Sequence, residues 1–333
     1  MNKNLLSYII CPECKKDELD IEIYASEYDS IGQGRIICKT CQTWYRIQNG
    51  ILDLLPLSLR NVKRYEVFAR EHNLFFQKQD SCGEEQKLTQ IHFFAKGTDA
   101  YEQEVTNSPY FVALDKLVFE CWIERNLKSG SLVLDVGCGT GRQTLPLIQR
   151  GIQVIGLDIS EEMLLLSRKK IKSMGLLKHV DFILCDAEEI PLKNITFDGC
   201  AITGALHHVS RPDVVVQKVA SMIADKGVFY SYDPHMSPAR FIYDFIMKFW
   251  KLYDEEASDS PLFTEKQLIE MLHEAGIKCK TKISTYLPPH FFYFFNQQNN
   301  VKLLKLTDRI FGSIPFVRNF GGMVIVEGRK VDC

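Results

Sequence analysis

Three closely spaced glycines that follow a short apolar run constrain this chain most strongly. Residues 132–136 read Leu-Val-Leu-Asp-Val, which suits a buried strand of a parallel sheet. Gly137, Gly139 and Gly141 come next, at every second position. Glycine lets the backbone turn tightly and lets a ligand lie against bare main chain. The sequence therefore predicts a strand, a ligand-binding loop and then a helix.

The spacing of these glycines excludes two common phosphate-binding loops. A dinucleotide-binding loop would need glycine where this chain has Arg142. A Walker loop needs Gly-Lys followed by Ser or Thr, and the loop lacks that sequence. The carboxylate of Asp135 would repel a phosphate, because it lies two residues before the first glycine. A ligand with a cationic or amino group suits this loop better.

Two further apolar runs end in aspartate. Asp158 ends the run 154–158, 17 residues beyond Gly141, where an acid can accept both hydroxyls of a ribose. Asp186 closes a third run that begins at Val180. Because the carboxyl ends of parallel strands meet at one edge of a sheet, we expect the three aspartates to surround one ligand site.

These segments resemble the class I S-adenosylmethionine-dependent methyltransferases, in particular the quinone-biosynthesis members. The matching segments are LDVGCGTG, GLDIS, CDAEEIPL and FDGCAITGALHHV, in the family's order and spacing. The resemblance covers roughly residues 100–330. It implies an α/β fold, with a Rossmann-like sheet of seven strands, an antiparallel last strand and helices on both faces. The alternation of strand and helix patterns along the chain independently favours this class.

The resemblance also implies how the methyl donor, S-adenosylmethionine, is held. The glycine loop would face the methionine end and the ribose, and Asp135 would reach the amino group or an ordered water near it. Asp158 would accept from the ribose hydroxyls and Asp186 from the adenine amino group. The full set of residues implied to bind the cofactor is Asp135, Gly137, Cys138, Gly139, Gly141, Asp158, Ile159, Asp186, Ala187 and Thr203.

Two adjacent histidines follow the predicted strand 197–203. Acceptors in such sheets bind beyond the carboxyl ends of the strands, so His207 or His208 is a candidate general base near neutral pH. In the alternative interpretation one histidine caps or packs and the other is exposed. No Asn/Asp-Pro-Pro-Tyr/Phe motif follows this strand. That counts against methylation of an exocyclic base nitrogen or of a glutamine amide.

Two pairs of cysteines near the N-terminus predict a metal site. Both pairs have the spacing C-x₂-C, which offers two thiolates each to one tetrahedral zinc ion. Four thiolates leave no open position, so the zinc would be structural. The pattern resembles the zinc ribbon of the small activator subunit of tRNA and translation-factor methyltransferases, and that of a bacterial ribosomal-RNA guanine methyltransferase. The predicted ligands are Cys11, Cys14, Cys38 and Cys41.

The ribbon is expected to contain three strands and a core of its own. The sequence predicts strands over 19–28 and 35–38, with a turn at Gly32 and Gly34 between them. A last strand over 44–47 is followed by a turn at Asn49-Gly50. Because its core would be separate, we expect loss of zinc to unfold the ribbon and to leave the remaining fold intact.

The chain divides into three predicted parts: a zinc ribbon over 1–56, a helical connector over 57–108 and the methyltransferase domain over 109–333. Two aromatic-rich inserts, 235–262 and 287–319, interrupt the last part. They either pack on the core, cover an apolar acceptor, or face a bilayer. Predicted helices of the third part lie near 109–127, 142–150, 160–174, 211–224 and 264–275, the last with a capping box from Thr264 to Gln267.

Composition restricts the classes of function that this chain can have. The net charge is −2 over 333 residues, which gives no electrostatic footprint for nucleic acid. No apolar stretch is long enough to span a bilayer, and the N-terminus shows no signal-peptide pattern. Paired and scattered cysteines fit a reducing cytoplasm. The sequence thus predicts a cytoplasmic methyltransferase with a small-molecule or lipid-like acceptor, and the alternatives are an RNA methyltransferase that uses the ribbon or a non-catalytic adaptor.

Overall fold

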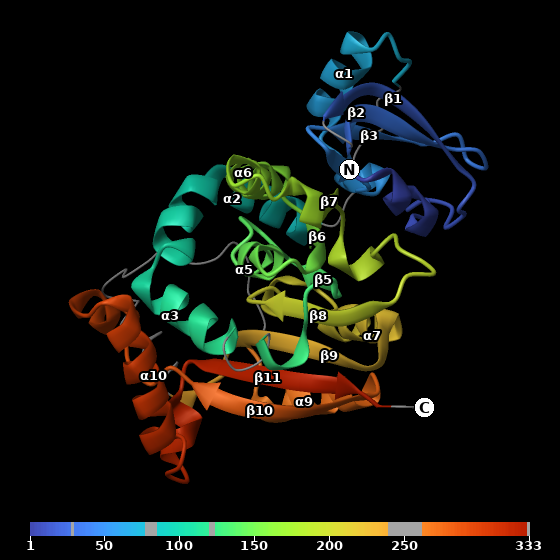
Figure 1. The fold of residues 1–333 in the computed structure, drawn as a ribbon. Coiled ribbons are helices and arrows are strands. Elements are labelled where there is room, and N and C mark those ends of the chain that lie inside the picture. Colours follow the sequence, from blue (N-terminus) through green and yellow to red (C-terminus); the bar gives the residue numbers. More distant parts are fainter. Residues whose placement is uncertain (28–29, 77–84, 120–123, 239–261, 332–333) are drawn as a thin grey trace.

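One continuous sheet runs through the molecule (Figure 1). The computed structural model describes residues 1–27, 30–76, 85–119, 124–238 and 262–331. Within them, eleven strands are joined in the order β1-β2-β3-β4-β7-β6-β5-β8-β9-β11-β10. No helix in this part of the chain is both long and apolar enough to cross a membrane.

Seven of these strands form the predicted Rossmann-like sheet. Strands β5 to β9 run parallel, and β11 lies antiparallel between β9 and β10, as the family resemblance implied. The apolar runs form these strands because they are buried on both faces. The seven are β5 (Leu132–Val136), β6 (Gln153–Asp158), β7 (Val180–Leu184), β8 (Phe197–Thr203), β9 (Ile223–Pro234), β10 (Ile277–Ser284) and β11 (Met323–Lys330).

Helices cover both faces of this sheet, as expected. On one face α7 (Pro212–Met222) and α9 (Glu265–Glu274) share a core with alternate strand residues such as Leu134. On the other face Val133 packs in a second core with helices α3, α5, α6 and α10. The bounds of these helices are α3 (Pro109–Val118), α5 (Thr144–Gln149), α6 (Glu161–Ser173) and α10 (Gln297–Phe311).

Local signals place the helix ends. Ser160 caps α6, and Thr264 forms the predicted capping box with Gln267 at the start of α9. Pro109 opens α3, although the side chain of Ser108 makes no capping hydrogen bond. A short helix, α4 (Glu124–Asn126), follows within the predicted span 109–127.

The N-terminal ribbon has four strands rather than three. They are β1 (Leu19–Glu27), β2 (Ser30–Cys38), β3 (Trp44–Gln48) and β4 (Ile51–Asp53). Gly32 and Gly34 lie inside β2, so the turn predicted there is wrong. The two strands approach closely at this point, since a Cβ on Gly34 would lie 2.4 Å from the Glu22 carbonyl oxygen. The turn at Asn49-Gly50 is confirmed, with positive φ at both residues.

Strand β4 joins the ribbon to the main sheet. It pairs in parallel with β7, Ile51 opposite Phe182, and the Leu54 N–H donates to the Leu184 carbonyl at 2.8 Å. Buried ribbon residues such as Ile47 belong to the same core cluster as Ile183. The predicted separate core is therefore wrong. Short apolar β4 covers an edge of the parallel sheet that would otherwise expose unpaired backbone groups.

A buried arginine ties the ribbon to helix α6. The Arg46 Nε donates to Asp53 Oδ2 at 3.0 Å, and its Nη2 pairs with Glu161 in the first turn of α6. Arg64 also pairs with Glu161. The side chains of Arg46, Asp53 and Glu161 are nearly inaccessible to solvent, whereas that of Arg64 is partly exposed. Such a cluster holds elements together because its charges are compensated only in this arrangement.

The segment 57–108, expected to be a helical connector, contains helices that pack on the main domain. It forms α1 (Val62–Glu71), α2 (Glu85–Tyr101) and a π-helical turn, η3 (Glu102–Thr106). Helix α2 packs on α6 and reaches the carboxyl edge of the sheet. Most of the first aromatic insert, residues 239–261, lies outside the described residues, so the expectations for it are not placed. The second insert forms η8 (Pro289–Phe294), α10 and η9 (Val317–Phe320).

Replacing Arg46 should destabilise the whole chain. In Arg46→Met the carboxylates of Asp53 and Glu161 would stay buried without their cation, so we expect the unfolding free energy to fall by about 3–5 kcal/mol. Urea denaturation followed by circular dichroism measures this. The matched control is Arg35→Met, whose partner Glu22 is about half exposed, with a loss within about 1 kcal/mol. Equal losses in the two variants would show that the Arg46 cluster does not join the parts.

Candidate functional site

A cavity lies at the carboxyl edge of the sheet. Residues at the ends of strands β5, β6 and β8 and residues of helix α2 line it. Figure 1 shows where these elements lie. Its empty space amounts to about 880 Å³, including the part open to solvent. Of the predicted residues it is lined by Gly137, Gly139, Asp158, Ile159, Asp186, Ala187 and His208.

The three glycines of the loop meet different structural requirements. All three have positive φ. A Cβ on Gly137 would lie 2.5 Å from the Cβ of Ala205, and one on Gly141 would lie 2.4 Å from Ser167 Oγ of α6. A Cβ on Gly139 would meet nothing within 4 Å. The outer two glycines thus allow close packing, while Gly139 presents bare main chain to the cavity.

Asp135 lies behind the loop rather than in the cavity wall. Its side chain is fully buried, and Thr144 Oγ1 donates to its Oδ2 at 2.6 Å. The other oxygen, Oδ1, has no hydrogen-bond partner among the described residues. Burial raises the pKa of this carboxyl group to about 7. A buried acceptor of this kind suits a ligand amino group that donates to it and supplies positive charge.

Asp158 both shapes the loop and faces the cavity. Its Oδ2 accepts the Gly139 N–H and its Oδ1 accepts the Ser160 N–H, each at 2.8 Å. Burial raises the pKa of Asp158 to about 6. Each carboxylate oxygen can accept a second hydrogen bond. A role in shaping the loop and a role in binding the ribose are therefore compatible for Asp158.

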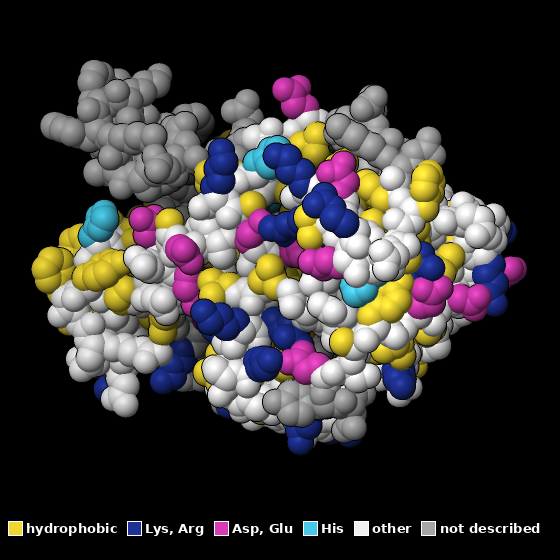
Figure 2. Space-filling model, turned by 90° about the horizontal axis from the view of Figure 1, so that it is seen from above, with side chains coloured by type: hydrophobic (Ala, Val, Ile, Leu, Met, Phe, Trp, Pro, Cys, Tyr) yellow, Lys and Arg dark blue, Asp and Glu magenta, His cyan; other side chains and the backbone are white. Residues whose placement is uncertain are grey.

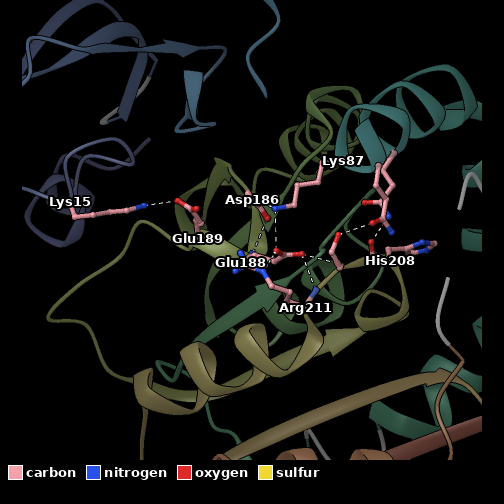
Figure 3. A network of polar contacts seen from close by, with 10 residues as sticks. Lys15, Lys87, Asp186, Glu188, Glu189, His208 and Arg211 are labelled. Atoms are coloured by element: carbon pink, nitrogen blue, oxygen red, sulfur yellow. Dashed lines mark hydrogen bonds and ion pairs between the residues drawn. The ribbon is translucent and has the colours of Figure 1, made fainter. Parts of the chain in front are cut away.

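Asp186 is held by a lysine that the sequence did not single out. The Glu188 N–H donates to Asp186 Oδ1 at 2.9 Å, and Lys87 Nζ on α2 pairs with Asp186 Oδ2 at 2.7 Å (Figure 3). Lys87 also reaches Glu188 Oε2, at 3.1 Å, and is itself buried. An adenine amino group at Asp186 would have to share these oxygens with Lys87.

Glu188 links three segments around the cavity. It belongs to η6 (Ala187–Glu189), and its Oε1 accepts the N–H groups of Ser210 and Arg211. Burial alone would raise the pKa of Glu188, but hydrogen bonds from Arg211 and Lys87 hold it below its usual range. On the other side, Gln90 of α2 donates to the His208 carbonyl. The first turns of α2 are thus fastened both to the segment that carries Asp186 and Glu188 and to the segment that carries His208 (Figure 3).

The two histidines, which the sequence treated alike, differ in position. Both lie in η7 (Leu206–His208), with ring centroids 4.0 Å apart. His207 is buried, and its Nδ1 lies 2.9 Å from Asp233 Oδ1. His208 lines the cavity and meets the Phe94 ring edge-on at 5.2 Å. Only His208 is therefore placed in the cavity wall.

Several predicted cofactor residues lie just outside the wall. Cys138 is buried and packs the loop onto β6. Its Sγ would lie 3.0 Å from a Cβ added to Gly156. Asp135, Gly141 and Thr203 also do not line the cavity. Sequence reasoning missed Lys87, Gln90, Phe94 and Tyr101 of α2, because no local motif marks a helix that meets the site only through folding.

The four predicted metal ligands come together in the ribbon. Their sulfur atoms all lie within 4.8 Å of one another. Cys11 and Cys41 Sγ are 3.6 Å apart, and Cys14 and Cys38 Sγ are 3.5 Å apart. Four thiolates at about 2.3 Å from one tetrahedral ion would be about 3.8 Å from each other. The arrangement fits such an ion.

The cysteine cluster is connected to the cavity by an ion pair. Lys15, next to Cys14, pairs with Glu189 at 2.6 Å (Figure 3). Glu189 belongs to η6, the turn that also carries Glu188 and follows Asp186. Both residues of this pair are about half exposed, so the pair aligns the two segments more than it stabilises them.

The raised pKa of Asp135 should be visible as a pH dependence of stability. Its pKa is about 7 in the fold against about 3.9 in an unfolded chain, so between these values the folded state holds a proton that the unfolded state releases. Stability should therefore fall as pH rises from about 4 to 7. In Asp135→Asn the slope should be shallower, by up to about 1.4 kcal/mol per pH unit. Urea denaturation at pH 5, 6 and 7 measures it.

The control for this slope is Asp198→Asn on strand β8, whose side chain is exposed. It should keep the slope of the original protein. Parallel curves for all three proteins would contradict the account of Asp135.

Two parts of the chain match family models. Residues 2–50 match the Trm112p-like protein model, and residues 133–227 match the methyltransferase domain model. The second match covers the glycine loop and the strand ends that form the cavity. The first covers all four cysteines.

Relatives and solved structures agree with the second match. A ubiquinone/menaquinone biosynthesis C-methyltransferase of Coxiella burnetii is 27% identical over 38% of this chain and 55% of its own length. A sterol 4-C-methyltransferase of Caenorhabditis elegans is 23% identical over 53% of this chain and 56% of its own. The chain thus spans about half the length of these relatives. Magnesium protoporphyrin IX methyltransferase from Synechocystis, solved with bound S-adenosylhomocysteine, shares the fold, with a TM-score of 0.52 and 17% identity over 74% of this chain and all of that one.

Proposed function

We propose that this chain, a class I S-adenosylmethionine-dependent methyltransferase with a Trm112p-like N-terminal domain, transfers a methyl group to a small-molecule or lipid-like acceptor. One observation carries the proposal. The cavity combines bare main chain at Gly139, the carboxylate of Asp158 and, behind the loop, a buried carboxyl oxygen of Asp135 that lacks a partner among the described residues. A nucleoside with an amino acid tail offers hydroxyls and an amino group to these positions.

Donor roles follow from that geometry. Asp158 accepts from the ribose hydroxyls, Asp135 receives the amino group and Asp186 accepts from the adenine amino group. Gly137 and Gly139 lie against the donor, and Ile159 and Ala187 add apolar wall and backbone. Cys138, Gly141 and Thr203 support the loop from outside. S-adenosylmethionine supplies an activated methyl group, so the chain's task is to place the acceptor and to exclude water.

The wall beyond the donor residues favours an apolar acceptor. It includes Ile202, Leu206, Val209 and Val215, together with Phe94 of α2. Apolar walls exclude water, which strengthens the electrostatic interactions of transfer. His208 is the proposed base for an acceptor proton, because it lines the cavity. His207, fixed by Asp233, positions the neighbouring ring. The names of the quinone and sterol relatives support acceptors of this class.

A second candidate follows from the Trm112p-like match over residues 2–50, since such ribbons suit a role with RNA. The net charge of −2 speaks against it, because domains that bind nucleic acid are typically basic overall. The third candidate, a non-catalytic adaptor, is disfavoured by the cavity at the glycine loop and Asp158.

Removing the carboxylate of Asp158 should weaken donor binding. In Asp158→Ala we expect the affinity for S-adenosylhomocysteine to fall by about 1–3 kcal/mol, through loss of charge-assisted hydrogen bonds. Calorimetric titration measures this. Asp198→Ala, which removes an exposed aspartate from a neighbouring strand, should bind as the original protein does. Unchanged affinity in Asp158→Ala would remove Asp158 from the ribose role.

The same pair of variants identifies the acceptor class. Incubation with S-adenosylmethionine and a lipid extract should yield a product heavier by one methylene group, formed normally by Asp198→Ala and in reduced amount by Asp158→Ala. Labelling of RNA and of no lipid or metabolite would overturn the proposal in favour of the second candidate. Donor binding without transfer to any of these would favour the adaptor.

We also propose that the four cysteines hold one structural zinc ion. The short distances between their sulfurs support this, as does the Tyr45 hydroxyl 3.0 Å from Cys11 Sγ, a hydrogen bond that would orient a ligand thiolate. Zinc would thus stabilise a module that joins the main sheet through β4.

Removing zinc should destabilise the ribbon and the main sheet together. Chelation, or the double substitution Cys11→Ser/Cys41→Ser, should lower the melting temperature of the chain in a single calorimetric transition, because the two parts share one core. Cys279→Ser, a half-exposed cysteine on β10, is the control and should keep its zinc. Metal analysis without zinc, or a separate early transition of the ribbon, would contradict this.

A further inference from the structure

A cluster of exposed hydrophobic side chains follows strand β10. We call it the η8–α10 surface, residues 289–316. Eight of the fifteen large hydrophobic side chains that are exposed among the described residues belong to it. Phe294 and Phe316 are 79% and 77% exposed. Scattered exposed hydrophobics are ordinary, but a cluster marks an interaction site. The eight are Phe291, Tyr293, Phe294, Phe295, Leu306, Ile310, Ile314 and Phe316.

The backbone beneath these side chains is anchored. Phe292 is fully buried and meets Tyr110 of α3 at 5.2 Å between ring centroids. Asn300 Nδ2 donates to the Phe292 carbonyl at 2.9 Å, and α10 packs along α3 and β10. The inner face of α10 buries Val301 and Leu304. The exposed aromatics are thus held outward by packed neighbours.

The surface is also basic. Lys302, Lys305 and Arg309 are exposed on α10. Within 289–316 the sequence holds one acidic residue, Asp308, which is buried and paired with Lys282. Lys302 and Arg309 therefore lie on the same helix as the exposed Leu306 and Ile310, and the segment 289–316 itself contributes no exposed acid, although the whole chain is slightly acidic.

The position of the surface relates it to the cavity. Helix α10 follows the carboxyl end of β10, and the cavity opens at the carboxyl ends of β5, β6 and β8. Figure 1 places α2, α3 and α10 along one side of the molecule, the side toward which β8 and β10 point. Figure 2 shows hydrophobic side chains gathered at the same end, on the left.

We propose that the η8–α10 surface docks on an anionic lipid bilayer. Aromatic and aliphatic side chains that enter the headgroup boundary, together with cations that meet anionic lipids, are the two signals that stable peripheral binding needs. A second copy of this chain is a poorer occupant, because a two-fold interface would bring Lys302 and Arg309 of both copies together. Docking does not depend on the methyl transfer proposed above. It would place the cavity edge near lipid-like acceptors.

Sedimentation with vesicles tests the proposal on the full chain. We expect binding to phosphatidylcholine vesicles that contain phosphatidylglycerol, and about tenfold weaker binding to pure phosphatidylcholine. Lys302→Gln/Arg309→Gln should remove most of this preference. Phe294→Ser/Phe316→Ser should lower binding to both vesicles by about tenfold or more. The matched control is Phe75→Ser, because Phe75 is 83% exposed and lies outside the surface.

Other outcomes overturn the proposal. These are absence of binding to anionic vesicles at physiological salt, equal binding by all variants, or an equal loss in Phe75→Ser. Light scattering that finds a dimer, abolished in Phe294→Ser/Phe316→Ser, would assign the surface to a second copy. Each variant is also titrated with S-adenosylhomocysteine. Unchanged affinity shows that the fold and the donor site are intact, so the result for the membrane stands apart from the result for methyl transfer.

Discussion

The backbone ladder between β4 and β7 is the interaction on which the arrangement of the molecule depends. It adds the ribbon to the parallel sheet beside the strand that leads to Asp186. Two side-chain connections then follow from it. Arg46 reaches Glu161, three residues after Asp158, and Lys15 reaches Glu189, three residues after Asp186. The ribbon is therefore tied to the two strand ends that are proposed to hold the nucleoside, so its folding and the shape of the donor cavity are coupled.

Helix α2 completes the cavity from the opposite side. Lys87 brings a buried positive charge to Asp186 and Glu188, and Gln90 holds the backbone at His208. Without that cation the two neighbouring carboxylates would repel each other in a buried place. The polar residues of α2 thus bind the acidic groups at the strand ends. Its Phe94 adds an apolar side chain to the cavity wall.

The sequence predicted the parts of this arrangement that arise locally. Apolar runs such as 132–136 form buried strands, the capping box at Thr264 begins α9, and positive φ accounts for the glycines of the loop. It did not predict β4, because three residues carry no periodicity and their partner lies about 130 positions away. The sequence did not predict the role of Lys87 either, because its acidic partners are distant in the chain. The sequence did not distinguish the positions of His207 and His208, because the conformation of η7 determines which of the two rings is buried.

The most direct measurement of the central claim is a crystal structure of the full chain with S-adenosylhomocysteine. The account predicts the ribose at Asp158, the amino group at Asp135 and the adenine beside Asp186, with Lys87 either sharing that carboxylate or displaced from it. It further predicts the sulfur facing the apolar wall near His208, where the acceptor is to be received. A nucleoside bound elsewhere, or a cavity that stays empty at saturating ligand, would contradict the account.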